Sequence, residues 1–495
     1  MKKQLILFLV LLLSFFLVAC QETTSTTTTT TEVTTELTTT LPQTISAIVG
    51  SLENENNIGL FLTETPYSSM GINFELSTNT LGFVEYGLKD SGEYTRLEAT
   101  QKITVVNNKT VYLYEAVMDD LISAQTYSYR ITNNDDSETS AYHEFSMPDS
   151  EAESFTFMYL ADPQENAETG YMAYAYSILN VLDFSQQNYD FVVFPGDVIN
   201  DADVQSQWNL FFKYSSVFSY EKPLIATTGN HDSGAITEDR INSLEFDGYM
   251  NLPNNGPIYE EFNEIDGDLR TSHFDDGKTY SFDYGTAHFV VIDTEIYCDG
   301  TTACITYDES NADILNEWVR NDLTNNNQLW TIVLLHRGPY SLSYDTDSVR
   351  DNLVPIFDEF GVDLVLAGHD HQYSRAVYQN LELIQFKRSN EYFKGTISLI
   401  EALEEDCHFN NYTSALGVTY LTANTSGTKY YGGDKSSGID VNYKFIEENP
   451  VIPMITVTNE YIQVISYGLE KDTGLSIVPT GVYVLEEFMI SRPAN

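Results

Sequence analysis

Asp, Asn and His residues recur at five points along this chain, each directly after an apolar run. Their carboxylate, amide and imidazole groups bind hard to borderline metal ions, and no Cys joins them. Two metal ions about 3.5–4 Å apart need an anionic bridge and several N or O ligands on each side. The set therefore predicts a centre for two ions among Mn, Fe, Zn and Mg, and excludes a thiolate zinc site. The five groups are Asp162, Gly196-Asp197, Gly229-Asn230-His231-Asp232, His336 and Gly368-His369-Asp370-His371.

Asp197 is well placed to be the bridge between the two ions. A glycine precedes Asp197, Asn230 and His369, and glycine lets the backbone turn sharply at a strand end. His369 and His371 are two residues apart, so an extended segment would put both on one face, and a turn would re-aim them. Either geometry could bring both rings to neighbouring ions.

The elements that must position these residues alternate between strands and helices. Apolar runs of four to seven residues predict buried strands, and helical spacing of apolar residues appears between some of them. Such alternation predicts α/β layers, in which chemistry gathers beyond the carboxyl ends of the strands. We expect strands at residues 155–161, 191–195, 224–228, 331–335 and 362–367, and helices at 171–184, 313–323 and 349–360.

Residues 45–150 are predicted to form a separate all-β unit, and residues 151–495 the α/β unit. In the first unit, short runs with a period of two recur between turn signals, which is typical of a β-sandwich. Its single His, His143, is interpreted as structural, so this unit is a predicted scaffold. Strand-like runs after residue 450 are interpreted as closing strands of the second unit. The alternating runs of the first unit are 72–76, 82–86, 111–117 and 127–131.

Residues 1–19 are typical of a secretory signal peptide, with a basic start and an apolar run too short to span a membrane. The ending Leu17-Val18-Ala19-Cys20 resembles a bacterial lipobox, which implies cleavage before Cys20 and lipid attachment to its sulfur. The alternative is an ordinary signal peptide with a chance Cys. Residues 20–44 are rich in Thr and predict an extended tether. We therefore expect an extracytoplasmic protein that contacts the bacterial membrane through its lipid anchor alone.

The net charge of −49 repels nucleic acid and anionic lipid, so a protein that reads nucleic acid is excluded. The four Cys are too few for a disulfide scaffold. One disulfide is plausible outside the cytoplasm, with Cys298–Cys304 favoured and a bond from either residue to Cys407 as the alternative.

The order Asp-x-Gln, Gly-Asp, Gly-Asn-His-Asp, His and Gly-His-x-His resembles the calcineurin-like metallophosphoesterase superfamily, and most closely its purple-acid-phosphatase-like branch. The resemblance extends from Phe155 to about Tyr430. The string from Val84 to Arg130 resembles the fibronectin-III-like domain that precedes the catalytic domain in purple acid phosphatases. The resemblance implies a four-layer αββα metallophosphoesterase sandwich preceded by a small all-β sandwich domain.

The resemblance also implies roles for individual residues. His231 is similar to the residue outside the ligand sets that stabilises the transition state or protonates the leaving oxygen. Asp232 would orient His231 and hold it cationic, or alternatively cap a helix. The implied ligands are Asp162, Asp197 and His371 for one ion, and Asp197, Asn230, His336 and His369 for the other.

Two positions depart from the family's pattern. The family often has His two residues after the first Asp, where this chain has Gln164. The carbonyl oxygen of Gln164 could bind a metal ion directly or only orient a bound water. Purple acid phosphatases have a Tyr three residues after the bridging Asp, and its phenolate gives the colour. This chain has Asn200 there, so we expect no purple chromophore and no requirement for iron.

The activity implied by the resemblance is that of an acid-phosphatase-like enzyme at the cell surface, in which a hydroxide bound to the metal ions attacks the phosphorus of a phosphate ester. Arg337 and Arg375 adjoin the motifs and could clamp phosphate through two hydrogen bonds each, or be structural. A phosphodiesterase or nucleotide hydrolase on the same site is one alternative. A non-catalytic surface binding protein that retained the fold is the other.

Overall fold

The computed structural model describes residues 41–106, 109–232, 244–258, 278–297, 309–384, 409–431, 439–445, 448–470, 479 and 481–493. Residues Thr44–Asn495 form one compact unit. The signal peptide, Cys20, most of the tether, Cys298, Cys304 and Cys407 lie outside the described residues, so the lipid anchor and the disulfide stay predictions. Within the described ranges, no helix is both long and apolar enough to span a bilayer.

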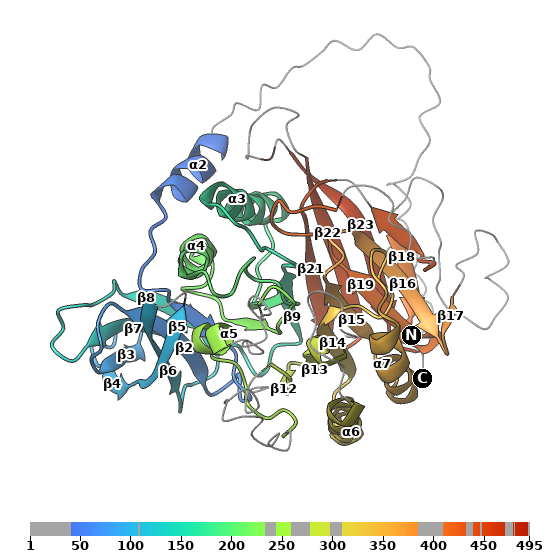
Figure 1. Cartoon of the computed structure of the whole chain (residues 1–495), viewed down its shortest axis with the longest axis horizontal. Helices are drawn as coiled ribbons and strands as arrows, with labels where there is room; N and C mark the ends of the chain where they lie inside the picture. Colours follow the sequence, from blue (N-terminus) through green and yellow to red (C-terminus); the bar gives the residue numbers. More distant parts are fainter. Residues whose placement is uncertain are drawn as a thin grey trace, which may run out of the picture. The chain divides into compact units, whose positions relative to one another are not determined.

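The first sheet has eleven strands among the described residues and joins segments that are far apart in the sequence (Figure 1). Strands β9, β10 and β11 are parallel neighbours, and the closing strands β21–β23 extend the sheet from β9 in antiparallel pairing. The order is β18 (Phe409–Thr413), β23 (Gly481–Ser491), β22 (Tyr461–Glu470), β21 (Val451–Thr458), β9 (Ser154–Tyr159), β10 (Phe191–Phe194), β11 (Leu224–Ala226), β1 (Gly59–Phe61), β2 (Met70–Leu76), β6 (Lys109–Met118) and β5 (Thr100–Val106).

The second sheet contains the remaining strands of the α/β unit that the structure describes. Its neighbours β13, β14, β15 and β19 are parallel, and β12 and β16 pair with them in antiparallel. The order is β12 (Tyr280–Tyr284), β13 (Ala287–Ile292), β14 (Trp330–Arg337), β15 (Leu364–Gly368), β19 (Val418–Thr422), β16 (Tyr373–Gln379) and β17 (Glu382–Leu383), with β20 (Tyr443–Phe445) also on β16.

Both faces of the central parallel strands β10, β11, β13 and β15 are buried, which explains why their sequences are apolar without alternation. In β9, Phe157 and Tyr159 pack into the cluster between the two sheets, whereas Met158 packs into the cluster beneath the helices. Successive side chains of a strand point to opposite faces, so one run serves two cores. Phe157 contacts Phe289 of the second sheet edge-on, with ring centroids 5.6 Å apart.

Helices cover the outer face of each sheet and complete the four layers (Figure 1). Side chains of α3 (Glu168–Ser185) and α4 (Gln205–Ser215) pack on the first sheet, and those of α6 (Glu309–Asn325) and α7 (Asp347–Phe360) pack on the second. The predicted four-layer fold and the helices expected at 171–184, 313–323 and 349–360 are therefore confirmed. A shorter helix, α5 (Leu244–Tyr249), lies beside β5.

The all-β unit is a two-sheet sandwich, but it is not separate from the α/β unit. Its second sheet, β4 (Thr95–Glu98), β3 (Gly82–Leu88), β7 (Thr126–Asn133) and β8 (His143–Ser146), packs on β2 and β6 through a core that includes Phe74, Tyr114 and Ile131. Its other sheet is continuous with the first sheet of the α/β unit, because β1 pairs in parallel with β11.

The start of the predicted all-β unit is helical. Residues Leu41–Ser51 form α2, across the expected boundary between the tether and the sandwich. Ile45 and Val49 are four residues apart, lie on one face of the helix, and are buried in the cluster beneath α3 and α4. The helical spacing of these two apolar residues is the signal that the sequence prediction missed.

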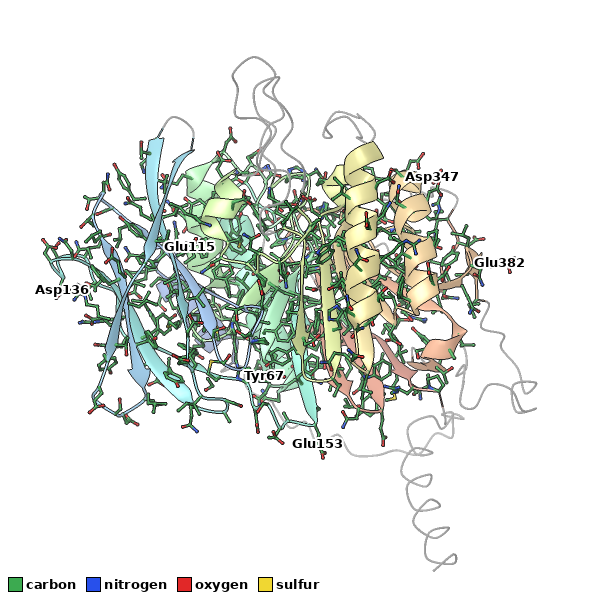
Figure 2. All side chains as sticks on the ribbon, turned by 90° about the horizontal axis from the view of Figure 1, so that it is seen from below. Tyr67, Glu115, Asp136, Glu153, Asp347 and Glu382 are labelled. Atoms are coloured by element: carbon green, nitrogen blue, oxygen red, sulfur yellow. The ribbon has the colours of Figure 1, made fainter. Side chains whose placement is uncertain are left out.

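Acidic side chains are spread over the outside of the protein (Figure 2). Asp136 in the sandwich, Asp347 at the start of α7 and Glu382 in β17 are all exposed. Charges in water are screened beyond about 8 Å at physiological ionic strength, so this dispersal limits their mutual repulsion.

A buried ion pair joins the two sheets. Arg375 in β16 donates through Nε and Nη2 to Oε1 of Glu486 in β23, at 3.0 and 2.9 Å. Tyr373 donates to Oε2 of Glu486 at 2.7 Å. Arg375 is 2% exposed and Glu486 is fully buried. This position does not fit the phosphate clamp that the sequence suggested for Arg375, because its guanidinium is buried between the sheets and bonded to Glu486.

We predict that Glu486→Gln lowers the free energy of unfolding by about 3–5 kcal/mol, because it leaves the Arg375 charge buried without a compensating carboxylate. Equilibrium denaturation in urea measures this change. Glu487→Gln on the same strand is the matched control, since Glu487 is only half-buried and its carboxylate accepts a bond from Gln463. Equal destabilisation by the two variants would contradict the structural role of the ion pair.

Candidate metal centre

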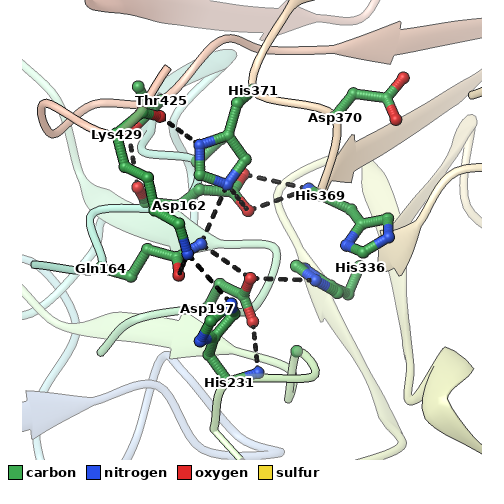
Figure 3. A network of polar contacts seen from close by, with 12 residues as sticks. Asp162, Gln164, Asp197, His231, His336, His369, Asp370, His371, Thr425 and Lys429 are labelled. Atoms are coloured by element: carbon green, nitrogen blue, oxygen red, sulfur yellow. Dashed lines mark hydrogen bonds and ion pairs between the residues drawn. The ribbon is translucent and has the colours of Figure 1, made fainter. Parts of the chain in front are cut away.

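The predicted metal ligands follow the ends of strands in both sheets and meet between them (Figure 3). Asp162 and Asp197 lie just beyond β9 and β10, and Asn230 lies beyond β11. The second sheet contributes His336 from the end of β14, and the turn between β15 and β16 contributes His369 and His371. The carboxyl ends of parallel strands thus bring residues over 200 positions apart into one site.

The backbone turns tightly at these residues. Asp162, Asp197, His369 and His371 have φ values of 44°, 51°, 71° and 50°, which is the left-handed region that non-glycine residues rarely adopt. Such strain persists only where the surroundings hold it, and it concentrates at functional sites. Gly196 has a φ of 94°, and a Cβ there would meet the Gly229 nitrogen and Nδ1 of His336 at 2.7 Å.

The structure gathers the donors into two groups that share Asp197. One group is Asp162, Asp197 and His371, and the other is Asp197, His336 and His369. Within each group the ligand atoms lie within 4.8 Å of one another, and all these residues are buried. Oδ1 of Asn230 lies 3.2 Å from Nε2 of His336, which places the amide with the second group. The groups have the membership that the sequence resemblance implied.

Backbone carbonyls orient two of the imidazoles. Nδ1 of His336 donates to the Pro195 carbonyl at 2.8 Å, and Nδ1 of His371 donates to the Lys429 carbonyl. A carbonyl only accepts, so both rings carry a proton on Nδ1 and present the Nε2 atom to the site.

The electrostatics of the site favour bound cations. Burial raises the pKa of Asp162 to about 7, although His336 opposes the shift. Burial also opposes ionisation of Asp197, but His336 and His231 outweigh it and hold the pKa of Asp197 well below its usual range. Burial would lower the pKa of His336, but Asp197 and Asp162 raise it to about 10. In the absence of metal ions, protons on Asp162 and His336 balance the negative charge of the carboxylates. The donor set therefore fits two metal ions that replace these protons.

Gln164 presents its amide nitrogen to the ligands. Its Oε1 accepts from Nζ of Lys429 at 2.6 Å, and its Nε2 donates to Oδ2 of Asp197 at 2.8 Å. An ammonium only donates, so the amide oxygen must face Lys429. Of the two roles left open by the sequence, this orientation favours a hydrogen bond within the site over direct metal ligation.

His231 lies beside the two donor groups, and its ring is held by Asn200 and not by Asp232, which the resemblance had implied. Its Nδ1 donates to the Asn200 carbonyl at 2.7 Å, and its backbone N–H donates to Oδ1 of Asp197 at 2.8 Å. Asp232 instead accepts from the backbone N–H groups of Gly229 and Val198, at 2.8 and 3.0 Å. Asp232 therefore shapes the loops that carry the ligands.

Arg337 lies at the site, with its guanidinium already engaged. Nε and Nη2 donate to the two oxygens of Glu295 at 2.8 and 3.0 Å, and Nη1 is 3.0 Å from Nε2 of His369. The sequence analysis missed both Glu295 and Lys429. Lys429 follows β19, a parallel strand whose carboxyl end meets the site, and that placement was the available signal.

Two segments of the chain match known protein families. Residues 155–373 match the family described as calcineurin-like phosphoesterase, and residues 56–147 match the purple acid phosphatase N-terminal domain. Purple acid phosphatase 22 of Arabidopsis thaliana is 25% identical over 211 residues, which cover 40% of this chain and 42% of the relative. An acid phosphatase of Aspergillus ficuum is 23% identical over 224 residues, covering 34% and 36%. The chain spans less than half the length of these relatives.

A solved structure confirms the fold over most of the chain. Purple acid phosphatase PPD1 from yellow lupin seeds superposes with a TM-score of 0.63 at 15% identity, covering 88% of this chain and 74% of the other. Taken together, the two matched segments and the superposition show that this chain has the fold of these phosphatases and is similar to them over residues 56–147 and 155–373.

We predict that metal affinity rises with pH in two steps. Binding requires Asp162 to be ionised and His336 to be neutral, and their pKa values in the metal-free protein are about 7 and about 10. Below about pH 7 two protons leave on binding, so the Kd should fall about 100-fold per pH unit, and above it about tenfold. Competition with a chelator for Mn²⁺ measures this. A single slope across pH 7 would show that Asp162 does not exchange its proton for the metal.

Proposed function

We propose that this chain is an acid-phosphatase-like hydrolase of phosphate esters with a two-metal centre. The observation that carries the proposal is Asp197, one buried carboxylate common to two groups of metal donors. A shared anionic ligand is what keeps two cations close enough to act on the same phosphate group. When bound, the metal ions supply positive charge at the phosphoryl oxygens and lower the pKa of water for in-line attack.

The side chains of this site contribute orientation and charge. Asp162 accepts the backbone N–H of His369 at 2.9 Å, which ties the ligand turn of the second sheet to a ligand of the first. His231 stands outside the two donor groups, and the Asn200 carbonyl fixes its ring. We propose that His231 acts on the phosphate or the leaving oxygen, not on the metal ions. A residue in that role stabilises the charge that develops in the transition state.

We predict that Asp197→Asn and His231→Ala lose activity for different reasons. Asp197→Asn removes the charge common to both donor groups, so it should lose metal ions and all hydrolysis. His231→Ala should keep its metal ions and lose about 10²–10⁴-fold in kcat, the scale of a removed general acid or charge stabiliser. The measurements are hydrolysis of 4-nitrophenyl phosphate and elemental analysis of each variant.

His143→Ala is the matched control, because His143 lies in the β-sandwich and bonds to Glu55 at 2.8 Å. Its activity and metal content should equal those of the wild type. Metal loss from His231→Ala as severe as that from Asp197→Asn would place His231 among the ligands. Wild-type protein that binds two metal ions and hydrolyses no phosphate ester would refute the proposed function.

We also propose that the enzyme is held at the outer face of the bacterial membrane by lipid on Cys20. The support is the Leu17-Val18-Ala19-Cys20 junction and the Thr-rich segment that follows it. Mass spectrometry of the mature protein should give an acylated Cys20 at its N-terminus. An unmodified terminus at another residue would contradict the anchor.

A further inference from the structure

Lys429 places a cation at the metal centre of a strongly acidic protein. The chain has 24 Lys and Arg against 73 Asp and Glu. Nζ of Lys429 lies 2.6 Å from Oε1 of Gln164 and 3.0 Å from Nε2 of His231, at the edge of the first donor group (Figure 3). Its third contact, with Oδ1 of Asn200, is the longest at 3.4 Å.

The segment that carries Lys429 is anchored to both sheets. Thr425 Oγ1 donates to the Asp162 carbonyl at 2.6 Å, and the Ser426 backbone N–H donates to the Ala161 carbonyl at 2.7 Å. The Lys429 carbonyl accepts from Nδ1 of His371. The backbone is therefore fixed, and the contacts of Nζ with Gln164 and His231 hold the half-buried ammonium in place, so it is preorganised and not a mobile surface charge.

The two positions at which the sequence departs from the family's pattern both contact this ammonium. Gln164 and Asn200 stand where His and Tyr are common in the family, and each directs its side-chain oxygen at Nζ of Lys429. The two uncharged side chains thus hold a fixed cation next to His231. An ammonium has three N–H donors, and the weak contact to Asn200 is the one that an anionic oxygen can replace.

We propose that Lys429 binds a non-bridging oxygen of the substrate phosphate and makes the site prefer phosphomonoesters to phosphodiesters. This inference rests on the proposed hydrolytic function. A phosphomonoester carries about two negative charges above its second pKa of about 6, whereas a diester carries one. A diester also replaces one charged oxygen with an esterified oxygen, which makes a poorer acceptor for an ammonium. The fixed cation therefore interacts more strongly with the monoester.

The test compares Lys429→Met with the wild type and with Lys429→Arg, which keeps the charge. Lys89→Met is the matched control, since Lys89 is an exposed lysine that pairs with Glu144 in the sandwich. For each metal-loaded protein we would measure metal ions per chain, the Kd of inorganic phosphate by calorimetry, and kcat/KM for 4-nitrophenyl phosphate and bis(4-nitrophenyl) phosphate.

Lys429→Met should keep its metal ions, bind inorganic phosphate about 10–100-fold more weakly, and lose a similar factor in its monoester-to-diester ratio, the scale of one lost hydrogen bond to a charged group. Lys429→Arg should recover most of both effects, and Lys89→Met should match the wild type. Should Lys429→Met fail to fold, Lys429→Gln replaces it with the same expected results, because it removes the charge and keeps a polar side chain.

An unchanged phosphate Kd, an equal loss on both esters, or loss of metal ions would each overturn the role of Lys429. These outcomes leave the proposed function intact as long as the wild type hydrolyses the monoester. A wild type that hydrolyses neither ester refutes the proposed function, and the phosphate Kd then decides the role of Lys429 by itself.

Discussion

Two carboxylates withdrawn from water are the constraint on which the rest of this site depends. Asp162 is fully buried and Asp197 is 1% exposed. A buried charge is tolerated only when hydrogen bonds and opposite charges compensate for its lost hydration. The backbone N–H groups of His369 and His231 supply part of this compensation, and the imidazole of His336 supplies another part. The remaining demand for positive charge fits the two metal ions that we propose for this site.

The fold meets this constraint by bringing the strand ends of the two sheets together, so that each sheet covers the ligands of the other. Each sheet alone would leave its strand ends open to solvent. The ligands from β9, β10 and β11 are covered by the turn after β15 and by the segment after β19, which bonds to the carbonyls of Ala161 and Asp162. The Arg375–Glu486 pair holds the same sheets together at β16 and β23. The contacts that pack the two sheets together therefore also position the polar site at their strand ends.

The sequence predicted those features that depend on local pattern. Uninterrupted apolar runs identified the strands, and the polar residues at their ends identified candidate metal donors with Asp197 as the bridge. The division of these donors into two groups was implied by the resemblance to a known family. What it missed depends on tertiary contact. Arg375 adjoins a motif and Lys429 lies far from one in the sequence, but only the packing shows that Glu486 neutralises Arg375, whereas Nζ of Lys429 reaches His231. The pairing of β1 with β11 likewise could not be predicted from the sequence, because it joins segments more than 150 residues apart.

That pairing limits where the chain could be truncated. Strand β11, Leu224–Ala226, has β10 on one side and β1 on the other, and all three of its residues are buried. A truncated protein that begins after residue 150 would expose the backbone donors and acceptors of β11 along an apolar margin. Such exposed strand edges pair with strands from other molecules, so the truncated protein would tend to aggregate. The N-terminal sandwich therefore covers an edge of β11 that would otherwise be open to pairing with strands of other molecules.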